Sequence, residues 1–361
     1  MRNNYKTVLE NAVVIAILTL VCISSCRKPD DKNIIPAHCT NGVMDGDETG
    51  IDCGGSCNAC TQTDVYIAGQ QYTTSPHMVA RYWKNGVAVD LTDGTNDANV
   101  YSITVVGNDV YVAGFESNGT KNIAKYWKNG TAVNLTDGTN DAMAGGIVVS
   151  DGDVYVAGVE SNGTLGVAKY WKNGVAVSLP STYSARALTI AIAGGDVHVG
   201  GFEIDSSGHQ YATYWKNGIG TTFDTRGALH SIVVSGSDVY AVSDRKFGIN
   251  NVAQSFQNSD GAVFNSVFVS GTDVYLGGSD FTSGNLIAAY WKNGTETKLT
   301  NGPNFTSTGS VFAVGDDIYV VGAETTPSFM NIARCWKNNV PVSFCDTTHS
   351  SSATSVFVVQ H

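Results

Sequence analysis

The chain has 361 residues, with 32 acidic and 21 basic side chains and a formal net charge of −11 at pH 7. This surplus of negative charge excludes a general affinity for nucleic acids or anionic lipid surfaces, and no basic run offsets it. Forty glycines against seven prolines, with abundant Val, Tyr, Thr and Asn, favour short strands joined by tight turns.

The N-terminus has the features of an export signal. Two basic residues precede an apolar run over residues 12–23, which is shorter than the roughly 20 apolar residues that a membrane-spanning helix needs. The sequence ISSC at 23–26 resembles the lipobox of bacterial lipoproteins, in which an aliphatic and two small residues precede a lipidated cysteine. The resemblance implies a signal peptide over residues 1–25 and a lipid anchor on Cys26. An ordinary signal peptide cut near Ser25 is the alternative.

Residues 26–37 are polar and contain proline, which indicates a tether. Two aspartates closely follow the anchor, and in this the segment is similar to the surface-export signals of Bacteroidetes-type lipoproteins. The resemblance implies a surface-exposed lipoprotein of a bacterial outer membrane, attached to the membrane through the lipid on Cys26.

A disulfide-rich element is expected over residues 38–60. Four cysteines crowd into this segment: Cys39, Cys53, Cys57 and Cys60. In a cytosolic protein they would favour zinc, but in an exported chain an even number indicates two disulfides, with three possible pairings. The pattern C-x-NG…ETG-x-DCGG-x-C-x2-C resembles a small cysteine-rich element that recurs in extracellular bacterial proteins.

Four carboxylates lie between these cysteines: Asp45, Asp47, Glu48 and Asp52. Closely spaced acidic residues with intervening glycines are what a calcium loop needs, because a hard cation takes several oxygens from a sharply turning backbone. The full EF-hand spacing is absent. A solvated acidic loop held by the disulfides is therefore the alternative to a calcium site.

The rest of the chain, residues 61–361, repeats one phrase. The tripeptide DVY or a variant recurs at intervals of 42 to 45 residues, with one interval of 35, at Asp64, Asp109, Asp153, Asp196, Asp238, Asp273 and Asp317. All six tryptophans follow at a nearly fixed distance, mostly within the phrase YWKNG, and Phe256 is interpreted as the equivalent in the fifth unit. A period near 44 is typical of propellers and solenoids.

The sequence pattern of each unit predicts four strands. In the second unit, SITVVGNDVYVAG indicates strand, tight turn and strand, and NIAKYWKNGTAVNLT indicates a second hairpin whose Asn129-Gly130 suits a type I′ turn. Seven such units predict an all-β fold, a seven-bladed β-propeller of four-stranded blades. The C-terminal TSVFVVQH matches the first strand that the first unit lacks, so we expect it to complete the first blade and close the ring. The interval of 35 residues predicts that the fifth unit has lost most of its outermost strand.

Strands such as IYVVG and VHVGG, followed by an aromatic strand, resemble kelch-type propellers. The YWKNG phrase resembles repeat-built surface lipoproteins of Bacteroidetes-type bacteria. The kelch match is partial, because only Gly200-Gly201 and Gly277-Gly278 keep the double glycine and because Tyr and Trp are adjacent here. The resemblance therefore implies a type of blade and no kelch function.

Two further cysteines, Cys335 and Cys345, fall in the last unit. A two-residue turn in KNNV would place Cys335 opposite Val342 and Cys345 opposite Ile332, on opposite faces of the hairpin, which is poor disulfide geometry. Pro341 could enlarge the turn. A disulfide between the two cysteines therefore stays open.

The longer, polar connections are expected to emerge on one face of the disc, where binding usually takes place. Seven residues after each DVY aspartate, at this face, the units carry Gln71, Glu116, Glu160, Glu203, Arg245, Asp280 and Glu324. These residues predict an interrupted negative ring around the channel mouth, which would bind a cation, orient a sugar or meet a basic partner. An inherited, solvated surface is the alternative. The DVY aspartates and the DGTND loops are expected to be structural, satisfying backbone amides and forming turns.

Catalysis leaves little trace in the sequence. The histidines show no metal-ligand spacing, and no nucleophile elbow, phosphate loop or paired-carboxylate motif stands out. Propeller enzymes do assemble sites from single residues of different blades, and Asp244 and Arg245 of the divergent fifth blade are the first candidates. We expect a monomeric binding or interaction module for extracellular glycan or protein. A glycan lyase or hydrolase and a purely structural spacer are the alternatives.

Overall fold

The computed structural model describes residues 43–48, 53, 55–57, 62–254, 261–281, 286–301 and 304–361. The chain divides into two compact units, Met1–Gln62 and Thr63–His361. The expected signal peptide and tether, with Cys26, lie outside the described residues. No helix in the described part of the chain is long and apolar enough to cross a membrane.

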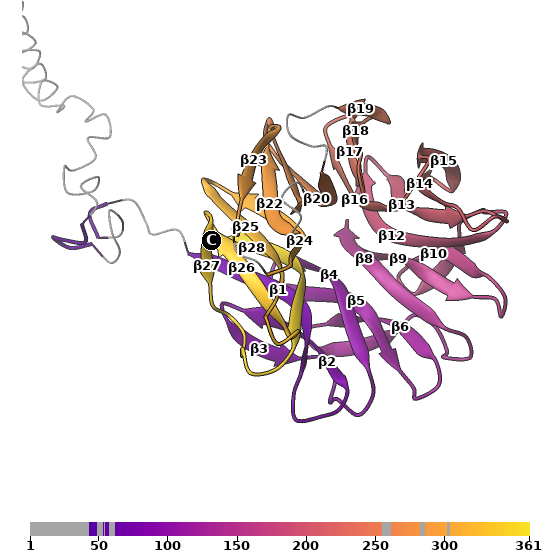
Figure 1. The fold of residues 1–361 in the computed structure, drawn as a ribbon, viewed down its shortest axis with the longest axis horizontal. Helices are drawn as coiled ribbons and strands as arrows, with labels where there is room; N and C mark the ends of the chain where they lie inside the picture. Colours follow the sequence, from indigo (N-terminus) through magenta and orange to yellow (C-terminus); the bar gives the residue numbers. More distant parts are fainter. Residues whose placement is uncertain are drawn as a thin grey trace, which may run out of the picture. The chain divides into compact units, whose positions relative to one another are not determined.

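The unit Thr63–His361 is a ring of seven antiparallel four-stranded sheets (Figure 1), which confirms the predicted seven-bladed β-propeller. From the channel outwards, blades 1 to 4 contain β28 (Ser351–Gln360), β1 (Thr63–Tyr72), β2 (Met78–Lys84) and β3 (Val87–Asp90); β4 (Ala98–Val106), β5 (Asp109–Ser117), β6 (Asn122–Lys128) and β7 (Thr131–Asn134); β8 (Ala142–Ser150), β9 (Asp153–Ser161), β10 (Gly166–Lys172) and β11 (Val175–Ser178); and β12 (Ser184–Ala193), β13 (Asp196–Ile204), β14 (Gln210–Lys216) and β15 (Ile219–Asp224). Blades 5 to 7 contain β16 (Leu229–Ser235), β17 (Asp238–Ser243), β18 (Phe247–Ile249) and β19 (Val252–Gln254); β20 (Ala262–Ser270), β21 (Asp273–Asp280), β22 (Ile287–Lys292) and β23 (Thr295–Lys298); and β24 (Thr306–Val314), β25 (Asp317–Thr325), β26 (Asn331–Lys337) and β27 (Val340–Val342).

The C-terminal strand closes the ring, as predicted. β28 pairs with β1 from Thr63 opposite Gln360 to Gln71 opposite Ser351. The first and last strands of the propeller therefore lie side by side in Figure 1, in indigo and yellow. This pairing removes the open edge that an unclosed blade would leave.

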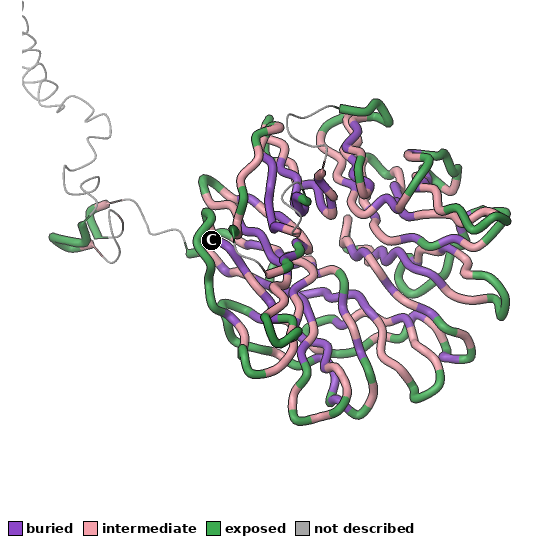
Figure 2. Tube along the Cα trace, viewed as in Figure 1, coloured by how far each residue is buried: buried purple, intermediate pink, exposed green. Residues whose placement is uncertain are grey.

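The core lies in layers between neighbouring blades. The tryptophan of each third strand is buried in six blades: Trp83, Trp127, Trp171, Trp215, Trp291 and Trp336. Trp127 of blade 2 belongs to the same apolar cluster as Tyr66 and Ala80 of blade 1, and Trp171 of blade 3 belongs to that of Tyr111. Figure 2 shows buried segments along the inner and middle strands and exposed ones at the rim. Each indole therefore joins two blades by the apolar area that it buries.

The YWKNG phrase forms a contact with the DVY phrase across the second and third strands. Asp109 accepts a hydrogen bond from Asn129 Nδ2 at 2.7 Å, and its other oxygen lies 2.8 Å from Lys128 Nζ. Lys128 lies over the Tyr111 ring at 5.2 Å, and Asn129 and Gly130 both have positive φ, as a type I′ turn requires. The aspartate, lysine and asparagine recur in every blade except the fifth, which lacks the lysine.

The DVY aspartates are structural, but the predicted contact with backbone amides is wrong. The amide beside Asp109, the N–H of Val110, donates to the side chain of Asn129 at 2.8 Å. The carboxylate instead accepts from the asparagine amide and the lysine ammonium of the neighbouring hairpin. Charged donors make stronger hydrogen bonds with a carboxylate than a neutral amide does.

The fifth blade is shortened at a different place from the one predicted. Its outermost strand β19 is present and is as long as β27 of blade 7, with three residues. The loss falls on the second and third strands, because β17 ends at Ser243 and β18 already begins at Phe247. The interval between repeats revealed how many residues were missing but not where.

The tryptophan position of the fifth blade was also assigned wrongly. Gly248 pairs with Ala241 as Trp127 pairs with Val112. A Cβ atom on Gly248 would lie 3.0 Å from the ring of Phe223 in blade 4, so this ring occupies the space beside the missing indole. Phe256, the predicted equivalent, lies outside the described residues.

The last two cysteines are free thiols. Cys335 lies opposite Val342, as the two-residue turn predicted. Cys345 lies beyond the end of β27, and its sulfur is 3.5 Å from the carbonyl oxygen of Ala333. No disulfide joins these two cysteines.

Candidate functional site

Every innermost strand carries a β-bulge at the same position of its blade. In each of the seven strand pairs one inner-strand position has no partner, or two in blade 3, and these unpaired positions include Tyr101, Gly145, Leu188, His230, Asn265, Gly309 and Thr354. A bulge bends the strand and redirects its side chain, and bulges are frequent beside active sites. Seven equivalent bulges therefore redirect seven different residues at one level of the channel.

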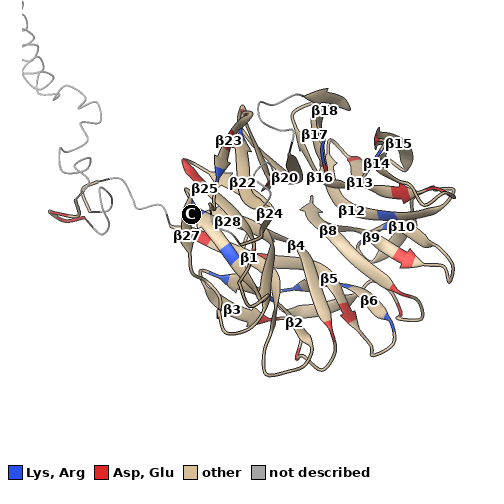
Figure 3. Ribbon diagram, viewed as in Figure 1, with Lys and Arg blue, Asp and Glu red and all other residues tan. Residues whose placement is uncertain are grey.

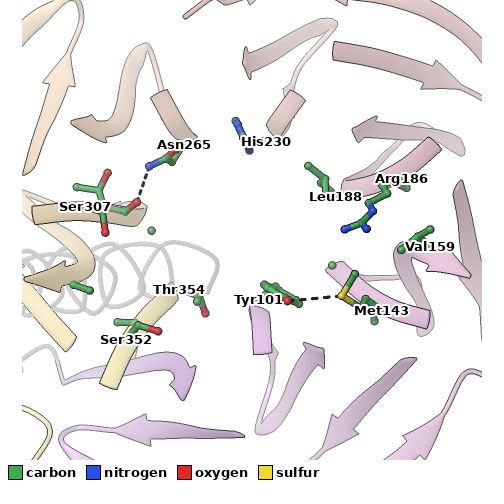
Figure 4. A pocket seen from close by; sticks show the side chains of 17 residues that line it. Tyr101, Met143, Val159, Arg186, Leu188, His230, Asn265, Ser307, Ser352 and Thr354 are labelled. Carbon is green, nitrogen blue, oxygen red and sulfur yellow. Dashed lines mark hydrogen bonds between the residues drawn. The ribbon is translucent and has the colours of Figure 1, made fainter. Parts of the chain in front are cut away.

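These seven bulge residues line one pocket of about 520 Å³ in the channel (Figure 4). In β4 the bulge residue Tyr101 is the fourth of nine residues, in the half that follows the blade-to-blade connection. The pocket thus lies toward the face that carries the longer connections. Its volume is within the range of about 300–1,000 Å³ that small-ligand sites occupy.

Serine side chains link the inner strands of neighbouring blades around the pocket by hydrogen bonds. The residue after the bulge is a serine in five blades, and its hydroxyl accepts a hydrogen bond from the backbone of the next inner strand. The pairs are Ser102 with Ile147, Ser231 with Val267, Ser266 with Val311, Ser310 with Val356 and Ser355 with Ile103. In blade 3, Gly146 takes this position, where a Cβ atom would lie 2.9 Å from the backbone of Thr189.

Arg186 is the single charged residue of the seven innermost strands, excluding histidine. Its guanidinium lies 6.0 Å from the centre of the Phe202 ring and points into the pocket in Figure 4. No ion pair or hydrogen bond engages this side chain within the described part of the chain. No carboxylate is among the described residues that line the pocket.

Tyr101 gives the pocket an aromatic wall. The residue is 39% exposed, and its ring lies 6.3 Å from that of Phe115. Burial raises the pKa of its phenol, and the positive charge of Arg186 partly offsets that rise. Other parts of the lining are polar, with side chains from Asn265 and Ser307 of blades 6 and 7 and from Thr354 of blade 1.

His230 brings the fifth blade into the pocket. One ring nitrogen lies 2.7 Å from Asp244 Oδ1, and the other oxygen of Asp244 accepts the Ala228 N–H at 3.2 Å. The hydrogen bond from His230 lowers the pKa of Asp244. Asp244 was a sequence candidate and contacts a pocket residue, whereas Arg245 is exposed beyond the end of β17 and does not line the pocket.

The positions of the predicted acidic ring do not line this pocket. Five of them pair instead with nearby side chains of their own blades: Gln71 with Arg81, Glu116 with Lys125, Glu160 with Lys169, Asp280 with Lys298 and Glu324 with Arg334, at 2.5 to 2.7 Å. Figure 3 shows acidic segments near the ends of β5, β9 and β13, in the middle of the blades. The structure therefore does not bring these residues together.

Glu203 departs from this pattern. Thr213 occupies the register position of Lys125 and Lys169, and its hydroxyl lies 3.4 Å from Glu203. Burial raises the pKa of Glu203. A second cavity of about 400 Å³ lies beside it, lined by Pro180, Ser181, Thr182, Glu203, Gly220, Thr221 and Thr222.

The cysteine-rich element is described only in part. Cys53 and Cys57 are each disulfide-bonded, and Cys39 and Cys60 lie outside the described residues, so the pairing stays a prediction. Asp47 accepts a hydrogen bond from Ser56, and Glu48 accepts one from the backbone of Asp45.

The calcium site is likewise untested. Asp52 lies outside the described residues. Within the described ranges, no three His, Cys, Asp or Glu residues are grouped to hold a metal ion. In the DGTND loops, Asp93 and Asp137 accept backbone hydrogen bonds from Thr95 and Thr139, as turn residues do.

Sequence reasoning missed the bulge residues, although the repeats contain a signal for them. Six of them lie eight residues before a DVY aspartate, and the seventh, Thr354, has the matching place in β28. Along this column the residues are Tyr, Gly, Leu, His, Asn, Gly and Thr, while the neighbouring columns repeat similar small or apolar residues. Strong variation at this position, and at the position two residues before it, marks the pocket in an otherwise regular repeat.

No family model matches this sequence, and no curated protein matches it significantly. A puromycin-hydrolysing peptidase of Mycobacterium tuberculosis has a similar structure, with a TM-score of 0.53 and 12% identity over 78% of this chain and 51% of the peptidase. The β-propeller domain of the Trilobed protease from Pyrococcus furiosus has a TM-score of 0.47 and 10% identity over 79% of this chain and 93% of that domain. The acylaminoacyl peptidase of Pyrococcus horikoshii has a TM-score of 0.47 and 11% identity over 79% of this chain and 50% of the peptidase.

This chain spans about half the length of the two full peptidases. At 12% identity or less, the likeness shows the propeller fold alone.

Proposed function

We propose that the propeller is a binding module that holds a small saccharide, or the end of a glycan, in its central pocket. The observation that carries this proposal is the ring of seven bulges, which places bulge residues of six different types around one cavity. A purely structural spacer needs closed blades and buried tryptophans. It does not need a varied column of bulge residues around a pocket.

The side chains of the pocket suit a saccharide. The half-exposed ring of Tyr101 offers an apolar surface of the kind on which the face of a sugar ring packs. Ser307 supplies a hydroxyl group, and Asn265 is held by a 2.7 Å hydrogen bond from its amide to the Thr308 carbonyl. The hydroxyls of Ser352 and Thr354 also line the pocket and are held in place by hydrogen bonds, the first from Gln70 and the second to backbone carbonyls. A pocket with an apolar wall and a few placed polar groups gives both affinity and orientation.

The cellular setting of this module rests on residues 1–60 and is part of the proposal. The lipobox-like ISSC supports an outer-membrane lipoprotein anchored by lipid on Cys26 and exposed at the cell surface. The tether and the cysteine-rich element would space the propeller from the membrane. Labelling cells with a clickable fatty acid tests the anchor, because Cys26→Ser should abolish labelling.

The binding proposal is tested by filling the pocket. The chain without residues 1–26 is screened on a glycan array, and hits are measured by calorimetry. Ser307→Trp should abolish binding because its indole would occupy the pocket, while Ser178→Trp on the exposed strand β11 should leave binding unchanged. Both variants must keep the melting temperature of the parent chain. Unchanged binding by Ser307→Trp, or no glycan bound by the parent chain, would overturn the proposal.

A second candidate function is catalysis on the bound glycan, as a lyase or hydrolase. The observation that favours it is His230, which lines the pocket and is oriented by Asp244 at 2.7 Å. An imidazole fixed by a carboxylate can act as a general base. Chromatography of each glycan hit after incubation would detect cleavage. Activity lost in His230→Ala while binding is kept would establish it, and no cleavage by the parent chain would exclude it for that glycan.

A further inference from the structure

Resting on the proposed function of the central pocket, we propose that its ligand is an acidic saccharide whose carboxylate is bound by Arg186. The sugar ring would pack against Tyr101, and the uronic acid group would meet the guanidinium. The residues that carry this inference come from blades 2 and 4.

The charge of the pocket is opposite to that of the whole chain. The protein has a formal charge of −11, yet among the described residues that line the cavity Arg186 is the one with a formal charge. The equivalent positions of the other inner strands, two residues before each bulge residue, hold Asn99, Met143, Ala228, Val263, Ser307 and Ser352. The arginine is therefore a departure confined to one blade.

Arg186 is not used by the fold in the way that Arg81 and Arg334 are. Arg81 lies 2.7 Å from Asp90, and Arg334 lies 2.7 Å from Glu324. Arg186 instead lies over the Phe202 ring, which orients the guanidinium without occupying its in-plane donors. A guanidinium with free donors matches a carboxylate in shape and charge, and binds it through two parallel hydrogen bonds.

The surroundings of Arg186 favour an acidic sugar over a bare anion. The guanidinium and Tyr101 line the same cavity, and the positive charge of Arg186 acts to lower the pKa of the Tyr101 phenol against the larger effect of burial. The cavity of about 520 Å³ also has room for more than an inorganic ion. The polar residues Asn265, Ser307 and Ser352 line other parts of it. An aromatic surface and an arginine, in a pocket whose described lining has no carboxylate, suit a ring that carries both hydroxyls and a carboxylate.

The test compares charged and neutral forms of the same sugars. Calorimetry measures binding of oligogalacturonate, oligoglucuronate and alginate oligosaccharides, each beside its fully methyl-esterified form, by the chain without residues 1–26. We expect at least one acid to bind tenfold or more tightly than its ester, because a hydrogen bond to a charged group is a strong one. In Arg186→Gln this preference should fall to less than threefold. Arg226→Gln, on an exposed arginine outside the pocket, should keep it.

The outcomes separate this inference from the proposed function. Equal binding of acid and ester, or a preference that survives in Arg186→Gln, would overturn the acidic ligand and leave glycan binding intact. Binding of neutral array glycans without any of the acids would do the same. Absence of binding to every saccharide, neutral or acidic, would overturn the proposed function itself.

Discussion

Glu203 shows how one residue changes a contact that the other blades share. Lys125 and Lys169 pair with Glu116 and Glu160 at 2.5 Å, whereas blade 4 places Thr213 at this register position. The carboxyl group is left beside a cavity, and its burial raises its pKa. The repeat therefore shows which side chain would restore the pair.

We predict that Thr213→Lys stabilises the propeller. The new ammonium would reach Glu203 as the lysines of blades 2 and 3 reach their partners, and would lower the pKa of Glu203. We expect a gain of about 0.5–1 kcal/mol in the free energy of unfolding, the size of a partly exposed ion pair. Denaturation in urea measures it. In a Glu203→Gln background the gain should vanish, and an equal gain there would show that charge pairing is not its cause.

Single residues also show the limits of prediction from sequence. Counting along the strand correctly predicted that the acidic positions lie at the ends of the second strands. It did not predict the direction in which their side chains point. Lys125 lies two residues before Trp127, so the two point to the same face of the strand, where Glu116 also lies. The basic partner was visible in the repeat, and the alternation of side chains would have identified it.

At the scale of elements, hairpins could be predicted because their chemistry is local. Asn-Gly turns and the DVY and WKN phrases determine register within a few residues, and the structure has these turns where the sequence placed them. The bulges could not be predicted in this way, because a bulge is an offset between two strands and neither strand alone records it. Only the variable column before each DVY aspartate indicates it.

From the contacts that each DVY aspartate makes with the lysine and asparagine of the YWKNG phrase, we predict that the propeller loses stability in acid. Hydrogen bonds from Lys84, Lys128 and their equivalents lower the pKa of Asp64, to about 2, and of Asp109. An aspartate in the unfolded chain titrates near 3.9. The stabilisation is therefore complete above about pH 4 and is lost as the pH falls toward 2, because the unfolded state takes up protons first.

Urea midpoints between pH 7 and pH 2.5 measure this effect. We expect Asp64→Asn to lower the free energy of unfolding by about 1 kcal/mol at pH 7 and to reduce its fall in acid. Asp238→Asn is the matched control, since Asp238 has no lysine partner within the described part of blade 5. A midpoint that does not change between pH 5 and pH 2.5 would contradict the prediction.

At the scale of the whole molecule, the repeat and its incomplete first unit predicted both the number of blades and the closure. Six of the seven blades bury a tryptophan against a neighbour, so these blades do not complete their cores alone. The central pocket is a property of this scale too, because its lining residues come from all seven blades. A central cavity is expected once the ring is closed. Which side chains line it depends on the bulges, and these cannot be recognised from the sequence of a single strand.

Because β28 closes the ring, we predict that the stability of the propeller depends on this last strand. Removing residues 351–361 would expose the edge of β1 and uncover Ile67 and other residues of the cluster that Val356 and Val358 complete. It would also remove Ser352 and Thr354 from the pocket. We expect the shortened chain to lose cooperative unfolding and glycan binding, as measured by thermal denaturation and calorimetry.

A circular permutant separates the pairing of β28 from its position in the chain. Gln360 lies opposite Thr63, so a short Gly-Asn-Gly link between the ends can join them, with new ends opened in the blade-to-blade loop at residues 135–141. Because every strand pair is kept, this permutant should unfold cooperatively, within about 1 kcal/mol of the parent chain. A shortened chain as stable as the parent would show that the ring does not depend on β28. An unfolded permutant would show that chain order matters beyond the strand pairing.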